Sequence, residues 1–236
     1  MTSPLASTRS VPPPRSARPL RLGVLLSGSG TNFQAILDAI DEQRLDAKVS
    51  VVISNVASAG GLERAKRKDI PAIVIDHRRY GNRKDFDAAV VEVLEGHGVD
   101  YVVLAGFMRV LTNVLLDAFP TRVVNIHPAL LPAFPGLNAQ SQAFAYGVRV
   151  AGCTVHFVDA GTDTGPIIAQ AVVPVRNDDD DESLRQRILR AEHKLLPTVL
   201  QWIGEGRVTA KPGPKGNDRA RVVLDGVEGA FLFDDP

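Results

Sequence analysis

Three polar side chains of complementary chemistry lie next to apolar runs that are typical of β-strands. Asn125 and His127 close the run that begins at 123, and Asp163 lies between the runs at 154–158 and 167–175. In open α/β sheets, sites form at the carboxyl ends of strands. An imidazole can carry a proton near neutral pH, which a nearby carboxylate favours, and an amide donates hydrogen bonds at any pH. This set could stabilise an oxyanion and move a proton, as acyl or formyl transfer to an amine requires. A histidine with a purely structural role at a strand end would show the same pattern, so the spacing alone leaves that alternative open.

The elements that must position these residues alternate between strand and helix in the first half of the chain. Apolar runs at 22–26, 49–54, 72–75 and 101–104 predict strands, and apolar residues at helical spacing predict helices between them. This alternation predicts an α/β fold with an open, mainly parallel, twisted sheet and helices on both faces, as in Rossmann-like proteins. Strands at 123–126, 154–158 and 167–175 follow with little helix between them. We therefore expect the carboxy-terminal part to be mixed.

A long helix is predicted to begin near Asp181. Asp178 to Asp181 and Glu182 place negative charge at its start, and an apolar stripe follows from Leu184 to Ile203. We interpret the four consecutive aspartates as a solvated helix start, because hard-metal loops need interleaved Gly, Asn or backbone ligands at fixed spacing.

The domain prediction follows from these elements. A single domain is expected over 21–209, with 210–236 as a tail that carries one edge strand at 221–224. Residues 1–20 are rich in Pro, Ser and Arg and contain no acid. We expect them to be a disordered extension, with an Arg- and Ser-rich transit peptide as the alternative that composition leaves open.

Composition sets further limits. The 236 residues are 44% hydrophobic, which is enough for one sizeable core. Lys plus Arg equals Asp plus Glu at 27 each, so no global field attracts a nucleic acid or a membrane, and neither partner is expected. Cys153 is the only cysteine, and its apolar surroundings predict a buried structural thiol in a cytoplasmic protein.

A glycine-rich segment lies between the first strand and the first helix. Backbone amides of Gly28 to Asn32 and the helix dipole can bind an anion there. A dinucleotide site would need a third glycine where Phe33 stands, and the Gly-Lys-Ser/Thr of a Walker loop is absent. A single phosphomonoester is the ligand that this loop favours.

The motifs of the chain, in one uninterrupted order from about Arg21 to Val208, resemble those of the folate-dependent formyltransferases. Within that family the similarity is to the enzymes that act on glycinamide ribonucleotide in purine synthesis. The motifs that carry it are AGFMR at 105–109, NIHPALLP at 125–132, FPG at 134–136 and DTGPII at 163–168.

The resemblance implies a reaction. The glycyl amine of glycinamide ribonucleotide attacks the formyl carbon of the cosubstrate N10-formyltetrahydrofolate directly, through a tetrahedral intermediate and with no metal. Asn125 and protonated His127 stabilise the oxyanion, while Asp163 supports the imidazolium and relays the amine proton through water. The implied partners are small molecules, and a homodimer is left open.

The same resemblance assigns binding residues. Gly30, Thr31 and Asn32, together with Arg83, are implied to bind the substrate phosphate. Glu192 is implied to bind the hydroxyl groups of the ribonucleotide. The pteridine pocket is lined by Met108, Arg109, Val110 and Leu111, and a loop from Asp159 to Asp163 closes over it. Thr154 and His156 have support roles.

One position departs from the family pattern. Family members usually carry a histidine after Pro-Gly-x, where this chain has Asn138. An asparagine can hydrogen-bond but cannot become cationic, so a supporting role is expected for Asn138 and activity is expected to survive.

Other members of the family are the nearest alternatives. Methionyl-tRNA formyltransferase would add a substantial carboxy-terminal RNA-binding domain, and formyltetrahydrofolate deformylase would have a second histidine where this chain has Pro128. A non-catalytic folate- or nucleotide-binding regulator on the same scaffold is the alternative from another class.

Overall fold

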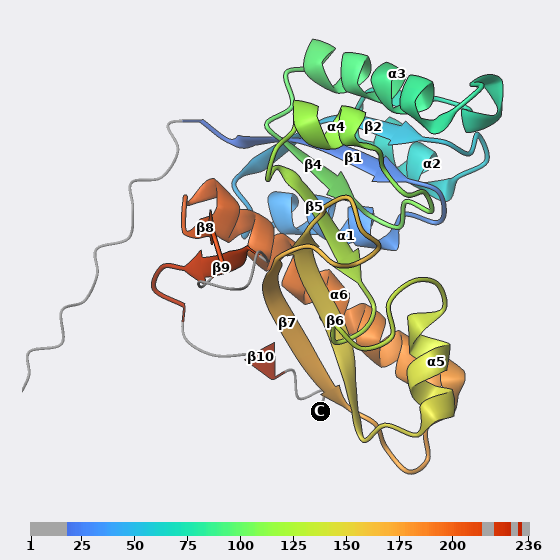
Figure 1. The fold of residues 1–236 in the computed structure, drawn as a ribbon, viewed down its shortest axis with the longest axis vertical. Coiled ribbons are helices and arrows are strands. Elements are labelled where there is room, and N and C mark those ends of the chain that lie inside the picture. The colour runs from blue at the N-terminus through green and yellow to red at the C-terminus, as the bar shows by residue number, and fades with distance from the viewer. Residues whose placement is uncertain (1–17, 214–219, 228–230, 233–236) are drawn as a thin grey trace, which may run out of the picture.

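The computed structural model describes residues 18–213, 220–227 and 231–232. The predicted extension therefore lies outside the described residues up to position 17, and so does most of the tail beyond 213. Among the described residues, eight strands form one sheet and two more form a separate hairpin (Figure 1). The sheet strands are β1 (Leu20–Leu26), β2 (Ala47–Ser54), β3 (Ala72–Val74), β4 (Tyr101–Leu104), β5 (Val123–His127), β6 (Val150–Phe157), β7 (Ile167–Pro174) and β10 (Phe231–Leu232).

The sheet is parallel in one half and mixed in the other. Its order is β10-β7-β6-β5-β4-β1-β2-β3, and the strands from β5 to β3 all pair in parallel. β6 is antiparallel to both β5 and β7. The predicted α/β class with a mixed carboxy-terminal part is confirmed.

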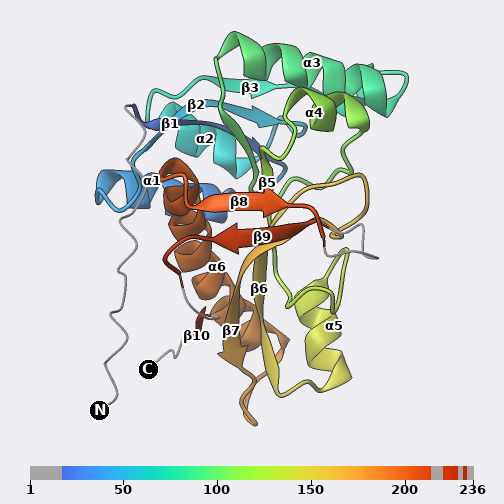
Figure 2. The same cartoon turned by 60° about the vertical axis from the view of Figure 1, so that its left-hand side comes forward.

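Helices cover both faces of the sheet (Figures 1 and 2). The face that carries the larger core cluster is covered by α1 (Thr31–Asp41), α2 (Gly60–Lys66) and α6 (Asp181–Gly204). The other face is covered by α3 (Arg83–Gly96) and α4 (Asn113–Ala118), with the short 3-10 helix η1 (His77–Arg79) before α3.

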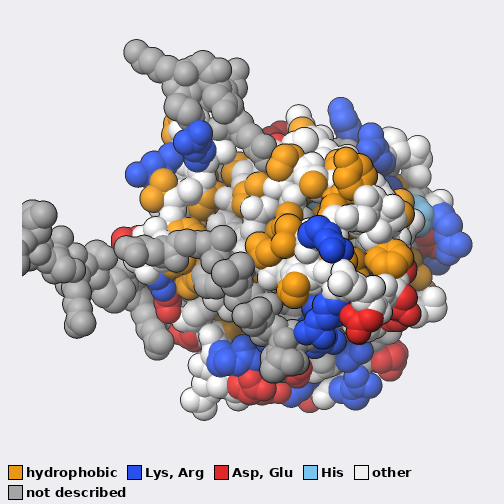
Figure 3. Space-filling view, turned by 90° about the horizontal axis from the view of Figure 1, so that it is seen from below, with side chains coloured by type: hydrophobic (Ala, Val, Ile, Leu, Met, Phe, Trp, Pro, Cys, Tyr) orange, Lys and Arg blue, Asp and Glu red, His pale blue; other side chains and the backbone are white. Residues whose placement is uncertain are grey.

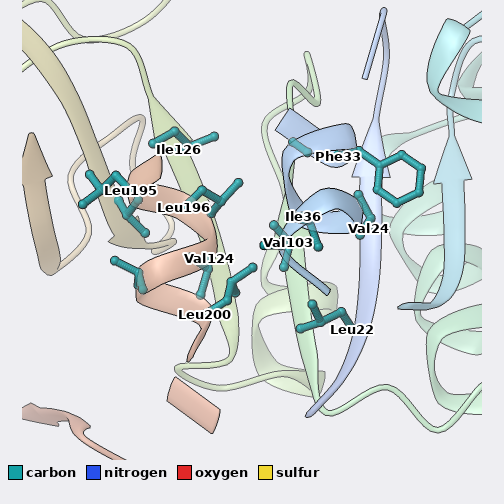
Figure 4. Close-up of a cluster of buried hydrophobic side chains, with 14 of the residues drawn as sticks. Leu22, Val24, Phe33, Ile36, Val103, Val124, Ile126, Leu195, Leu196 and Leu200 are labelled. Carbon is teal, nitrogen blue, oxygen red and sulfur yellow. The ribbon is translucent and has the colours of Figure 1, made fainter. Parts of the chain in front are cut away.

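The core follows from strand alternation. Leu22, Val24 and Leu26 of β1 are buried in the cluster under α1 and α6, whereas Leu25 is buried in the cluster under α3. Figure 4 shows the first cluster, in which side chains of α6 meet β5 and side chains of α1 meet β1 and β4. Most charged groups lie at the surface, and acidic and basic side chains lie next to one another on the face seen in Figure 3.

The start of α6 agrees with its prediction in position but not in solvation. Asp180 caps the helix through a 2.7 Å bond from the Ser183 amide, and the Ser183 hydroxyl accepts from the Asp180 amide at 3.0 Å. Asp179, however, is not solvated. Its side chain is 3% exposed and binds the Arg187 guanidinium through two bonds, of 2.6 and 2.7 Å. This pairing, which the sequence interpretation missed, holds the pKa of the Asp179 carboxyl well below its usual range.

Five short elements of the described residues were not predicted. They are η1, α4, α5 (Ala139–Tyr146), β8 (Val208–Lys211) and β10. β8 pairs with β9 (Arg221–Leu224), a strand that was predicted with these bounds. The expectation of little helix after β5 was wrong for α5. That helix buries only Ala139 and Ala143, so it has no apolar stripe to read.

Candidate active site

The pairing of β5 with β6 brings four predicted site residues together. Asn125 stands opposite His156, and His127 stands opposite Thr154. Directly opposed residues of an antiparallel pair point to the same face of the sheet. Two residues that were assigned support roles therefore lie beside two of the three assigned to catalysis.

His127 lies between a backbone carbonyl and a carboxylate. Its side chain is 5% exposed, Nδ1 lies 3.4 Å from Asp163 Oδ2, and Nε2 lies 2.8 Å from the Phe134 carbonyl oxygen. A carbonyl can only accept, so Nε2 carries a proton and donates it. A second proton on Nδ1 would make the ring a cation paired with Asp163.

Asp163 is held by the segment that crosses the site. The Gly136 amide donates to Asp163 Oδ2 at 2.8 Å, and Phe134 of the same segment accepts from His127. Phe134, Gly136 and Asp163 all have positive φ, and such conformations persist where the surroundings fix them. Sequence reasoning placed 134–136 in a motif but missed this role, because it uses backbone groups that carry no residue-type signal.

His156 fixes the orientation of the Asn125 amide. Its Nδ1 lies 2.9 Å from the Phe157 carbonyl oxygen, so Nδ1 carries the proton. Burial lowers the pKa of the His156 imidazole, which favours the neutral ring with Nε2 as an acceptor. Asn125 Nδ2 lies 3.1 Å from that Nε2 and donates to it. The amide keeps a second N–H for another acceptor.

Thr154 anchors the segment after β5. It is fully buried, and its hydroxyl donates to the Ala129 carbonyl at 2.7 Å and accepts from the Leu131 amide at 3.0 Å. Gln170 of β7 donates to the same hydroxyl at 3.0 Å, a contact that sequence reasoning missed.

The glycine loop (residues 28–32) lies against the start of α2. A Cβ on Gly30, whose φ is +73°, would lie 2.7 Å from Gly61 Cα, and the Gly61 amide donates to the Gly28 carbonyl at 3.2 Å. Arg64 of α2 donates to the Ser29 carbonyl at 2.9 Å. Neither Gly61 nor Arg64 was predicted at the site.

Asn32 and Glu192, predicted separately, are in direct contact. Asn32 Nδ2 donates to Glu192 Oε2 at 2.6 Å, and both side chains are buried. Burial raises the pKa of the Glu192 carboxyl to about 7. Arg83 does not join this group. It is the exposed first residue of α3, after a strand that lies two places along the sheet from β1.

The predicted pteridine segment follows β4. Met108 and Val110 are 66% and 47% exposed, whereas Leu111 is buried in the core. The Arg109 guanidinium lies 4.8 Å from the centre of the buried Phe86 ring, a cation–π contact. The exposed apolar groups leave a surface that a flat ring system could cover.

A polar chain joins the loops after β1, β2, β3 and β4. The Met108 amide donates to Ser27 Oγ at 2.9 Å, and Ser27 donates to Asn55 Oδ1 at 2.6 Å. Asn55 Nδ2 lies 3.3 Å from His77 Nδ1. Sequence reasoning missed Ser27 and Asn55 as connectors, because the contact spans distant segments.

The remaining predicted positions lie in exposed loops. Asp159 Oδ1 accepts hydrogen bonds within its own loop, from the Thr164 hydroxyl at 2.7 Å and from the Gly161 amide at 3.1 Å. Asn138 is the exposed residue before α5, with φ +56° and no side-chain cap bond. An asparagine tolerates this left-handed conformation well, which gives a local reason for its presence.

One further prediction concerns the single cysteine. Cys153 is fully buried, as predicted, and burial raises the pKa of its thiol. Within the described part of the chain, no cluster of His, Cys, Asp and Glu could hold a metal ion, and no helix is long and apolar enough to span a membrane.

Comparison with known proteins gives one consistent family. A model of the formyl transferase family matches residues 20–200. The phosphoribosylglycinamide formyltransferase of Bacillus subtilis is 42% identical over 183 residues, which cover 78% of this chain and 94% of that protein. The human trifunctional purine biosynthetic protein adenosine-3 is 46% identical over 188 residues, and the chain spans only 19% of its length.

Solved structures agree. The glycinamide ribonucleotide transformylase 1 of Symbiobacterium toebii is 52% identical, with a TM-score of 0.82 over 89% of this chain and 95% of that one. The phosphoribosylglycinamide formyltransferase of Coxiella burnetii, solved with CHES, is 38% identical, with a TM-score of 0.82 over 92% of this chain and 100% of that one.

Proposed function

The chain belongs to the formyl transferase family, and we propose that it is a phosphoribosylglycinamide formyltransferase of de novo purine biosynthesis. It transfers the formyl group of N10-formyltetrahydrofolate to the glycyl amine of glycinamide ribonucleotide. The observation that carries this proposal is the cluster of Asn125, His127 and Asp163, built on one strand and one loop of a chain whose relatives bear that name.

The proposed reaction is direct attack of the amine nitrogen on the formyl carbon. The new C–N bond moves the carbonyl electron pair onto oxygen, and collapse of the intermediate breaks the bond to N10 of the folate. The free N–H of Asn125 donates to the oxyanion, and cationic His127 stabilises its charge. Asp163 holds the imidazolium and passes the amine proton through water toward N10.

His127 carries a constraint on this reaction. Its Nε2–H donates to the Phe134 carbonyl at 2.8 Å, so an oxygen of the substrate that takes this donor must displace the carbonyl. Nδ1 faces Asp163 throughout and need not move. The 134–136 segment therefore shifts on binding in this proposal, while the Asn125–His156 pair stays in place.

The two substrates occupy neighbouring strand ends. The ribonucleotide takes the glycine loop, with Glu192 and Asn32 for its hydroxyl groups, and the folate takes the exposed apolar surface of Met108 and Val110. No metal takes part in direct attack. A cytoplasmic location and small-molecule partners complete the proposal, and the chain acts alone or as a homodimer.

Turnover of the purified protein tests the proposal. With glycinamide ribonucleotide and N10-formyltetrahydrofolate, we expect formylated ribonucleotide and tetrahydrofolate to form in equal amounts. Calorimetry should show the ribonucleotide binding far better than its dephosphorylated nucleoside, because the loop donors would otherwise lack their anion. Folate binding without formyl transfer would instead support a non-catalytic folate-binding regulator. Equal affinity for the ribonucleotide and its dephosphorylated nucleoside would contradict phosphate binding by the glycine loop.

A further inference from the structure

The pteridine segment (residues 108–111) lies between β4 and α4, outside any helix or strand. Met108 and Val110 are 66% and 47% exposed, so packing against the core holds these two residues only in part. A segment with few buried contacts is ordered only where other groups hold it. The proposed folate surface therefore depends for its shape on side chains from other elements.

Ser27, the residue after β1, binds the chain on both sides of Phe107. Its amide donates to the Gly106 carbonyl at 3.0 Å, and its Oγ accepts from the Met108 amide at 2.9 Å. The hydroxyl has one hydrogen, which it donates to Asn55 Oδ1 at 2.6 Å. The lone pairs of Oγ are thereby left for the Met108 amide.

Asn55 and His77 fix the direction of this hydrogen bond. Asn55 is 6% exposed, and its Nδ2 lies 3.3 Å from His77 Nδ1. An amide nitrogen can only donate, so Nδ1 accepts and Asn55 Oδ1 is turned toward Ser27. Ser27 is therefore an acceptor toward Met108 in a chain of hydrogen bonds whose direction is set by a buried amide.

Helix α3 holds the other end of the segment. Asp87 is 2% exposed, and its Oδ2 accepts from the Thr112 amide at 2.6 Å and from the Thr112 hydroxyl at 2.7 Å. The neighbouring Phe86 ring stacks on Phe107 with centroids 6.4 Å apart and lies 4.8 Å from the Arg109 guanidinium. One end of the segment is thus fixed by buried groups, whereas the hydrogen bond at the other end is accepted by a single hydroxyl.

We propose that Ser27 is a positioning residue for the folate, which acts by holding the Met108 backbone in the conformation that binds. This inference rests on the function proposed above and adds a residue that acts through Met108. A segment that is ordered before its ligand arrives loses less conformational entropy on binding. Because Ser27 directly precedes Gly28, it also joins the folate segment to the loop proposed for the ribonucleotide.

The test compares Ser27→Ala with Ser50→Ala, a half-buried serine in the amino-terminal half of β2. Ser27→Ala removes the acceptor of the Met108 amide but keeps the backbone bond to Gly106. It should raise the KM for N10-formyltetrahydrofolate about 5- to 10-fold, the loss of one hydrogen bond. Ser27→Thr, which retains the hydroxyl, should recover most of this loss, and Ser50→Ala should change no kinetic constant.

The other kinetic constants distinguish positioning from a general structural effect. In Ser27→Ala, kcat and the KM for glycinamide ribonucleotide should stay within about twofold of wild type, because the bound complex, once formed, is unchanged. Two results would overturn the proposal. One is an unchanged KM for the folate, and the other is a comparable change in both KM values or in kcat.

Binding of tetrahydrofolate, measured by calorimetry, separates this inference from the proposed function. Its Kd should rise in Ser27→Ala by the same factor as the KM for the formylated folate. If Ser27→Ala weakens tetrahydrofolate binding but the wild-type chain forms no formylated ribonucleotide, the positioning role stands and the proposed activity fails. If Ser27→Ala forms the product with the wild-type KM for the folate, the activity stands and the positioning role fails.

Discussion

Glu192 is a carboxyl group that folding places where its charge is unfavourable. It is 4% exposed, its described partner is the Asn32 amide, and burial raises its pKa to about 7 from 4.5. Between those two pH values the folded chain binds more protons than the unfolded chain. The stability contribution of Glu192 is therefore largest below pH 4.5 and declines as the pH rises toward 7.

Glu192→Gln should reveal this linkage, because the amide cannot titrate. In urea unfolding of the ligand-free protein, the variant should gain about 1 to 3 kcal/mol relative to wild type between pH 4.5 and pH 8. Glu92→Gln, at an exposed glutamate of α3, is the matched control. A Glu192→Gln difference that stays constant with pH would mean that the buried carboxyl does not titrate in this range.

At the level of single residues, the sequence predicts those whose chemistry is in the side chain. Asn125, His127 and Asp163 were predicted as one set and lie together, as do Asn32 and Glu192. Phe134 and Gly136 act through a backbone carbonyl and a backbone amide. Because any residue supplies those groups, no residue type could have pointed to them.

The conformation of the glycine loop depends on its close contact with the neighbouring helix α2. Gly30 has φ +73°, and a Cβ there would lie 2.7 Å from the Gly61 backbone, which belongs to α2. Gly28 has open space around its Cβ position. The loop thus needs glycine at 30 both for conformation and for contact with α2.

Gly30→Ala should displace the loop from α2. We expect a loss of about 1 to 3 kcal/mol in unfolding free energy and a KM for the ribonucleotide raised at least about tenfold, since the amides that bind the phosphate move. Gly28→Ala is the control in the same loop and should change both quantities much less. Similar effects of the two variants on KM would contradict this account of the loop.

Strands that read as apolar runs and the long helix with an apolar stripe were predictable, whereas the short helices α4 and α5 were not. β4 and β9 have the predicted bounds, and α6 begins at the predicted Asp181. α4 has six residues, and α5 buries only two alanines, so neither gives a periodic signal. Yet α5 matters to the site, because Tyr146 at its end meets the Phe134 ring with centroids 5.8 Å apart.

The whole molecule brings the loops of three neighbouring strands to one edge. β5, β4 and β1 are adjacent in the sheet and parallel, and they carry Asn125 and His127, the pteridine segment and the glycine loop. Asp163 belongs to the mixed half of the sheet and lies on the loop between β6 and β7. The sequence predicted this class of sheet, but not the strand order that makes these three strands neighbours.

The central claim is that Asn125, oriented by neutral His156, donates to the oxyanion of formyl transfer. The kcat of Asn125→Ala tests it most directly, beside Asn177→Ala, a control at an exposed asparagine that accepts from Arg149. We predict that Asn125→Ala lowers kcat by roughly 10²- to 10³-fold with a much smaller change in KM, whereas Asn177→Ala retains wild-type turnover. An Asn125→Ala enzyme that keeps most of its kcat would contradict the account.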